Sequence, residues 1–283
     1  MRGLLLLLAA VAACGLVVRF GSAVAERLVP LLGEAQQNIA LVETIYTLTI
    51  FGALLVIAVA GGAWAKLNPL RPGKRPVAML ASGALLGAAG ILAAAVLARA
   101  AGSLDPGAAL GSSSSTLIWG SFVVLFAATA EEAYFRGWLQ PALAREYGVP
   151  IAILLTALAF AGLHVMGGAR SPTTLVNLFL GGLLFGLLAA RGGGLAGAVA
   201  AHFAWNWTEQ IGLGLDPNPG LGSFGALADY ELTGAALWGG SDEGLNASIA
   251  VTVALLALLV PMVILEWKNL VPWASRRRPA PAE

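Results

Sequence analysis

Apolar runs of membrane-spanning length recur along the whole chain and leave little sequence for a soluble core. They lie at about residues 3–18, 45–65, 76–97, 115–132, 150–166, 173–190, 195–211 and 247–267. Hydrophobic residues make up 58% of the sequence and charged residues 11%, and the mean hydropathy is +0.83. This composition is typical of polytopic membrane proteins. The sequence therefore predicts an all-α bundle of about eight transmembrane helices.

The first run is short for a transmembrane span, so a signal peptide is a rival interpretation. The residues before Cys14 also resemble a lipoprotein cleavage site, but residues 15–18 stay apolar, which favours a retained helix. Residues 19–43 are expected to form an amphipathic loop. Cys14 is the only cysteine in the sequence, which excludes an internal disulfide and a cysteine-based metal site. The sequence contains neither a P-loop nor a dinucleotide-binding glycine pattern, and we expect no nucleic-acid partner.

The charges between the runs predict the orientation in the membrane. Residues 66–75 contain Lys66, Arg71, Lys74 and Arg75 and no acid, and the tail contains Lys268 and residues 276–278, all arginine. Residues 212–246 contain Asp216, Asp229, Glu231, Asp242 and Glu243 and no Lys or Arg. The positive-inside rule then predicts cytoplasmic termini and an extracytoplasmic acidic loop. The expected organisation is N-terminal helices (1–114), a catalytic core (115–211), the acidic loop (212–246), and a last helix with a basic tail (247–283).

Two adjacent carboxylates, Glu131 and Glu132, lie at the far end of the fourth apolar run. Ionisable residues in a membrane segment are rare and are functional candidates. Glu132 and Arg136 are four residues apart, so on a helix they share one face and form a pair in the favourable orientation. Glu131 lies five residues before Arg136 and points away from it. The spacing thus assigns Glu132 to a structural pair and leaves Glu131 available as a base. The alternative without a function is that both glutamates are charges at a helix end that is solvated at the membrane interface.

Both histidines of the chain lie in apolar runs, each four residues from a possible partner on the same helix face. Phe160 precedes His164 in the fifth run, and Asn206 follows His202 in the seventh. A single histidine in an apolar helix is more often a packing residue. Three segments that contribute Glu131, His164, and His202 with Asn206 are harder to explain by packing, because each group is costly in lipid.

Hydrolysis is the chemistry that these residue types support. A carboxylate deprotonates water, and histidine and asparagine donate hydrogen bonds to a developing oxyanion. Two histidines and one glutamate are also the ligand set of a catalytic zinc site, here Glu131, His164 and His202. The residues alone leave both mechanisms open. We expect no obligatory cofactor, because Glu132 is committed to Arg136 and a zinc scheme would leave Asn206 without a role; zinc is the alternative.

Three short motifs, EEAYFR (residues 131–136), FAGLH (160–164) and HFAWN (202–206), occur in this order, each on its own predicted helix. Together they resemble the motifs of the CPBP family, which comprises CAAX prenyl endopeptidases and bacterial Abi-type membrane proteins, with myxosortases among the relatives. The resemblance implies an intramembrane protease of the glutamic or metallopeptidase type. It implies that Glu131 and His164 activate water, that His202 and Asn206 form an oxyanion site, and that Glu132, Arg136 and Phe160 are supporting residues.

The expected partners are the lipid bilayer and a protein or peptide substrate with a membrane-associated segment. The composition, rich in Ala, Gly and Arg, suggests the inner membrane of a bacterium. Two rival functions come from other classes. One is a proton- or ion-coupled transporter that uses the buried charges as a relay, although no internal repeat supports it. The other is a non-catalytic immunity or scaffold protein, for which the set of Glu131, His164 and His202 has no evident use.

Overall fold

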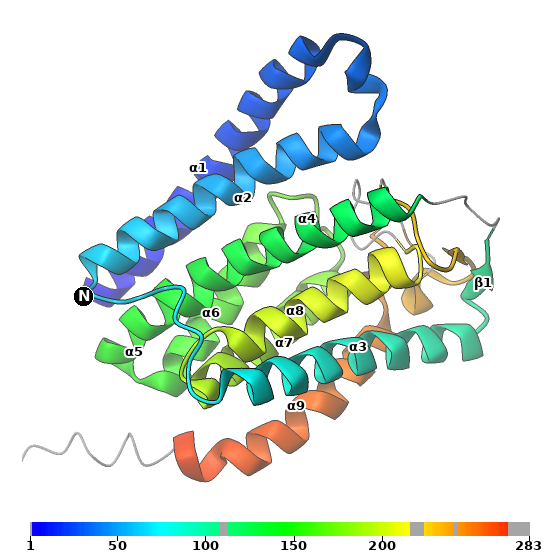
Figure 1. Ribbon diagram of the computed structural model, residues 1–283. Coiled ribbons are helices and arrows are strands. Elements are labelled where there is room, and N and C mark those ends of the chain that lie inside the picture. Colours follow the sequence, from blue (N-terminus) through cyan, green and yellow to red (C-terminus); the bar gives the residue numbers. More distant parts are fainter. Residues whose placement is uncertain (1, 108–112, 216–223, 240, 242, 271–283) are drawn as a thin grey trace, which may run out of the picture.

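Long helices run side by side in a bundle whose two ends carry the loops (Figure 1). The computed structural model describes residues 2–107, 113–215, 224–239, 241 and 243–270. The helices are α1 (Arg2–Leu28), α2 (Ile39–Trp64), α3 (Pro76–Ala100), α4 (Ser114–Glu132), α5 (Gln140–Tyr147), α6 (Val149–His164), α7 (Pro172–Gly192), α8 (Ala196–Trp207) and α9 (Ile249–Leu270). Of the charges used for orientation, Asp216, Asp242 and the arginines at 276–278 lie outside the described residues.

The predicted all-α membrane fold is confirmed. Within the described ranges, six helical segments are long and apolar enough to cross a membrane, and one of them runs without interruption from Ser114 to Tyr147. The shorter apolar helices α6, with 16 residues, and α8, with 12, pack against α7 and α3 and bring the number of apolar helical segments close to the eight predicted.

The prediction of a loop at residues 19–43 is wrong, because most of these residues are helical. Helix α1 continues to Leu28, and the 3₁₀ helix η1 (Val29–Gln37) carries the chain to α2. No proline occurs between Arg19 and Leu28, so the helix continues through the polar residues there. Pro30, at the start of η1, lacks the N–H that a continuing α-helix would need.

Helix α8 lies against α3 at a distance that only small residues allow. A Cβ atom added at Gly83 would collide with the carbonyl of Gly197, and one at Gly87 with the carbonyl of Ala201. Small residues let membrane helices approach closely where dispersion forces, rather than the hydrophobic effect, drive their association. This packing fixes the height and rotation of α8, and with them the position of His202 in the bundle.

The two ends of the bundle differ in charge. At one end the α2–α3 loop contacts the turn before α8, where the Leu195 N–H donates to the carbonyl of Arg71. We call it the basic end, after Lys66, Arg71, Lys74, Arg75, Arg145 and Arg191. At the opposite end β1 (Leu104–Pro106) pairs antiparallel with β2 (Tyr230–Leu232), next to the short 3₁₀ helices η5 (Ala236–Trp238) and η6 (Leu245–Ala247). We call it the acidic end, after Asp105, Asp229, Glu231 and Glu243.

Candidate active site

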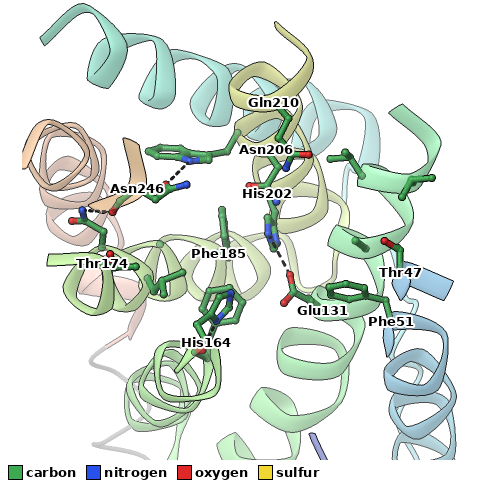
Figure 2. Close-up of a pocket in the computed structure, with 18 of the residues that line it drawn as sticks. Thr47, Phe51, Glu131, His164, Thr174, Phe185, His202, Asn206, Gln210 and Asn246 are labelled. Atoms are coloured by element: carbon green, nitrogen blue, oxygen red, sulfur yellow. Dashed lines mark hydrogen bonds and ion pairs between the residues drawn. The ribbon is translucent and has the colours of Figure 1, made fainter. Parts of the chain in front are cut away.

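A cavity of 140 Å³ lies between α2, α4, α6, α7 and α8 and has room for water molecules (Figure 2). Its lining includes Glu131, His164, His202 and Asn206, the four residues that the sequence analysis nominated for chemistry. Residues of the acidic end, Phe224 and Asn246, also line it. Three segments that are distant in sequence therefore bring their polar side chains to one internal space.

Glu132 and Arg136 form a buried ion pair next to His202. Arg136 lies in the π-helix η2 (Ala133–Leu139), which joins α4 to α5. Its Nη1 donates to Oε1 of Glu132 at 2.9 Å, and both side chains are fully buried. Its Nη2 donates to the Gly182 carbonyl at 3.1 Å, and its guanidinium carbon lies 4.7 Å from the centre of the Phe160 ring. Such a buried charge is tolerable only because each of these groups compensates for lost hydration.

His202 lies between the two adjacent glutamates. Its Nδ1 is 2.8 Å from Oε1 of Glu132, and its Nε2 is 3.5 Å from Oε2 of Glu131. A carboxylate paired with an arginine only accepts hydrogen bonds, so Nδ1 of His202 carries a hydrogen and donates it. Glu132 thereby fixes the tautomer and directs Nε2 toward Glu131.

Glu131 differs from its neighbour in exposure. Its side chain is 16% exposed and faces the cavity, whereas the Glu132 side chain is 0% exposed. The sequence analysis paired Glu131 with His164, but the imidazole in contact with Glu131 is that of His202 (Figure 2). The reason is geometric, because α8 lies beside α4 while His164 is near the far end of α6. A carboxylate and an imidazole in reach of one water are a suitable pair for proton transfer.

His164 is held by its own helix. Its Nδ1 is 2.8 Å from the carbonyl oxygen of Phe160, which only accepts, so Nδ1 carries the hydrogen and Nε2 remains available. The His164 ring lies 4.5 Å from the Phe160 ring, and Phe160 also packs edge-on against His202 at 6.1 Å. Phe160 therefore separates the two imidazoles and sets the orientation of both.

Several residues of the site carried no recognisable sequence signal. Phe185 of α7 stacks on His202 with ring centres 4.7 Å apart and planes at 12°. Asn246 donates through Nδ2 to both carboxylate oxygens of the fully buried Glu209, at 3.0 and 2.8 Å, and accepts from Nε1 of Trp205 through Oδ1. A phenylalanine in an apolar helix resembles any packing residue, and Asn246 falls in the stretch predicted to be the acidic loop, so neither stands out before the helices are placed.

The described side chains do not form a metal site. No three His, Cys, Asp or Glu side chains in the described part of the chain are grouped closely enough to hold a metal ion. Both imidazoles are engaged through Nδ1, His202 with Glu132 and His164 with the Phe160 carbonyl, and Nε2 of His202 faces Glu131. In the described structure the side chains of Glu131, His164 and His202 are not gathered into one tetrahedral ligand set.

A comparison with protein-family models adds independent information. No curated protein matches the chain. Residues 113–208, from the N-cap of α4 to the end of α8, match the model described as type II CAAX prenyl endopeptidase Rce1-like, which supports an intramembrane endopeptidase. This range contains all seven residues nominated from the three motifs. The resemblance predicted from the motifs is thereby confirmed, and helices α4 to α8 are similar to the Rce1-like type II CAAX prenyl endopeptidases.

Proposed function

We propose that this protein is an intramembrane endopeptidase that hydrolyses a peptide bond of a membrane-associated protein with water activated by Glu131. The observation that carries the proposal is the contrast between the two glutamates. Glu132 is buried and paired with Arg136, while Glu131 faces the cavity with its Oε2 3.5 Å from Nε2 of His202. A carboxylate in a cavity with room for water, with an imidazole beside it, is suited to general base catalysis.

The first step forms the bond between water and the substrate carbonyl. Glu131 removes a proton from the water while the water oxygen attacks the carbonyl carbon, and the carbonyl oxygen becomes an oxyanion. The Asn206 amide and His202, when it is protonated on Nε2, are the donors that line the cavity and stabilise that charge. Donors that are fixed before the reaction lower the barrier because they need no reorganisation.

The second step breaks the C–N bond. The electrons of the oxyanion return to form the carboxyl group, and the leaving nitrogen takes up the proton that Glu131 had removed. His164 lines the same cavity with Nε2 available to orient the water or to transfer that proton. Glu132 and Arg136 act on the reaction only through His202, whose tautomer they fix, and Phe160 acts through the two rings that it supports.

The proposed reaction needs no obligatory metal. Each of Glu131, His164, His202 and Asn206 has one role in it, whereas the zinc alternative leaves Asn206, which lines the same cavity, without a role. The protein is an integral membrane protein, and we place it in a bacterial inner membrane with lipid on its helices and a membrane-associated peptide in its cavity.

The experiment is a cleavage assay with purified protein in detergent micelles. A pool of fluorescence-quenched peptides with apolar segments and polar ends serves as substrate, and mass spectrometry identifies the products. Wild-type protein is expected to generate new termini, and Glu131→Gln none at the same protein concentration and the same melting temperature. Equal cleavage by both proteins would contradict the proposal.

A further inference from the structure

Gln210 is a buried residue whose side-chain oxygen has no hydrogen-bond partner among the described residues. It lies in the π-helix η3 (Thr208–Gly212) that continues α8, is 5% exposed, and lines the cavity. Among the described residues, nothing hydrogen-bonds its side-chain oxygen Oε1. Most buried side-chain polar atoms in proteins are hydrogen-bonded, and leaving one unpaired costs free energy. The partner of this oxygen therefore has to come from beyond the described residues.

Gln140 is a buried glutamine whose side-chain nitrogen and oxygen are both hydrogen-bonded within the protein, and it serves as a comparison for Gln210. It is also 5% exposed, but its Nε2 donates to the Gly186 carbonyl at 3.0 Å and its Oε1 accepts from the Thr156 hydroxyl at 3.4 Å. The two glutamines are equally buried in one bundle, and only the one in the cavity has an orphaned oxygen. The contrast points to a partner that enters the cavity.

The position of Gln210 defines what that partner is. His202, Asn206 and Gln210 are spaced by four residues and all line the cavity, so they form one polar stripe along α8 and its continuation (Figure 2). One turn of helix advances about 5.4 Å. An extended peptide advances about 3.3 Å per residue, so a peptide bond held at Asn206 places a neighbouring bond, one or two residues away, beside Gln210.

We propose that the Gln210 carboxamide is a substrate subsite that binds the backbone of an extended peptide segment next to the scissile bond. This inference rests on the proposed function. A carboxamide offers one acceptor and two N–H donors, which match the N–H and C=O of a peptide unit. A substrate helix must unwind before its backbone is attacked, and its freed peptide groups find no water in the bilayer core. Gln210 supplies a hydrogen-bond partner for these freed peptide groups, on the side of His202 and Asn206 that faces the acidic end.

The first arm of the test compares two matched variants without any substrate. Gln210→Leu removes an unpaired amide, so the melting temperature of the empty protein is expected to stay the same or rise. Gln140→Leu removes two satisfied hydrogen bonds and is expected to lower it. A melting temperature that falls as much in Gln210→Leu as in Gln140→Leu would show that Gln210 is structural and overturn the proposal.

The second arm measures binding in the inactive Glu131→Gln background, so that it does not depend on turnover. The probe is a fluorescein-labelled apolar peptide of about 20 residues, the length of one membrane span, and polarisation gives its Kd. Adding Gln210→Leu is expected to raise Kd about tenfold, which corresponds to a loss of about 1.4 kcal/mol of binding free energy. Adding Gln140→Leu is the control and leaves Kd unchanged. An unchanged Kd with Gln210→Leu overturns the subsite. Binding without cleavage by the wild-type protein would instead contradict the proposed function.

Discussion

Oε1 of Glu132 accepts hydrogen bonds from both Nδ1 of His202 and the guanidinium of Arg136, at 2.8 and 2.9 Å. Through this one buried oxygen, Glu132 at the end of α4 connects His202 of α8 with Arg136 of the π-helix η2. These hydrogen bonds give the two adjacent glutamates different roles. Glu132 holds the imidazole, and Glu131 remains at the water-accessible side of the same ring.

Arg136→Ala is expected to destabilise the protein strongly. The change removes the positive charge that compensates the fully buried Glu132, and breaking one side of a buried pair costs about 3–5 kcal/mol. The measurement is thermal or denaturant unfolding of purified protein in micelles. Arg145→Ala is the control, because Arg145 is an exposed arginine that donates to the carbonyl of Ala65. A loss in Arg136→Ala no larger than in Arg145→Ala would show that the buried pair has little structural value.

The sequence predicted this pair because its cause is local. A spacing of four residues places Glu132 and Arg136 on one helix face whatever the rest of the chain does, and the same holds for Phe160 with His164. The contact between Glu131 and His202 joins residues 71 positions apart and depends on how deeply α8 sits against α3. Spacing within one helix contains no such information, so His164 was expected in that place.

The limits of the helices were predictable where apolar runs meet glycine, proline or charge, as at Pro76 and Gly193. They were not predictable at Arg19, where charged residues continue a helix instead of ending it. The stacking of Phe185 and the orphaned Gln210 depend on tertiary packing and appear only once the helices are assembled.

The acidic end is expected to lie outside the cell, so that the cavity, which is lined by Phe224 and Asn246, receives its substrate from that side. Single cysteines at the exposed positions Lys66 and Glu231, introduced in a Cys14→Ala background, mark the two ends. A membrane-impermeant maleimide applied to intact cells is expected to label Glu231→Cys and to label Lys66→Cys only after permeabilisation. The opposite pattern would place the cavity mouth in the cytoplasm.

Glu243 is expected to fasten the loop of the acidic end to α7 in a pH-dependent manner. Its Oε1 accepts from the backbone N–H groups of Arg170 and Ser171 at 3.0 and 2.7 Å. Burial acts to raise the pKa of Glu243, but the Thr174 side chain, these N–H groups and the Arg170 charge outweigh it, so the pKa is lowered. A lowered folded pKa stabilises the loop at pH values above the ordinary carboxyl pKa, and this contribution disappears as pH falls through the folded value.

Hydrogen exchange of residues 224–239 measured across pH tests this prediction. In wild-type protein, exchange in the loop, corrected for its intrinsic pH dependence, is expected to accelerate as Glu243 is protonated. Glu243→Gln is expected to exchange fast at every pH, because a neutral amide accepts these hydrogen bonds more weakly. Glu231→Gln, a change on the exposed strand β2, is the control and keeps the wild-type profile. Identical profiles for wild type and Glu243→Gln would show that another contact fastens the loop.

Removing metal ions is expected to leave activity intact. The proposed base is Glu131 and the oxyanion donors are side chains, so no step requires a bound cation. Purified protein would be dialysed exhaustively against a chelator, assayed on a cleaved peptide, and analysed for metal by mass spectrometry. Stoichiometric zinc whose removal abolishes cleavage and whose return restores it would make the enzyme a metallopeptidase and assign Glu131 to metal binding.

A single turnover in water enriched in ¹⁸O tests the central claim most directly. If Glu131 acts as a base, the attacking oxygen comes from water and enters the new C-terminal carboxyl group, while the Glu131 side chain stays unlabelled. Mass spectrometry of the product and of the peptide containing Glu131 reads both positions, with Glu131→Gln as the control that gives no product. The account predicts one ¹⁸O atom in the product and none in Glu131. An ¹⁸O atom in the Glu131 carboxylate would show that Glu131 attacks the substrate itself and contradict the account.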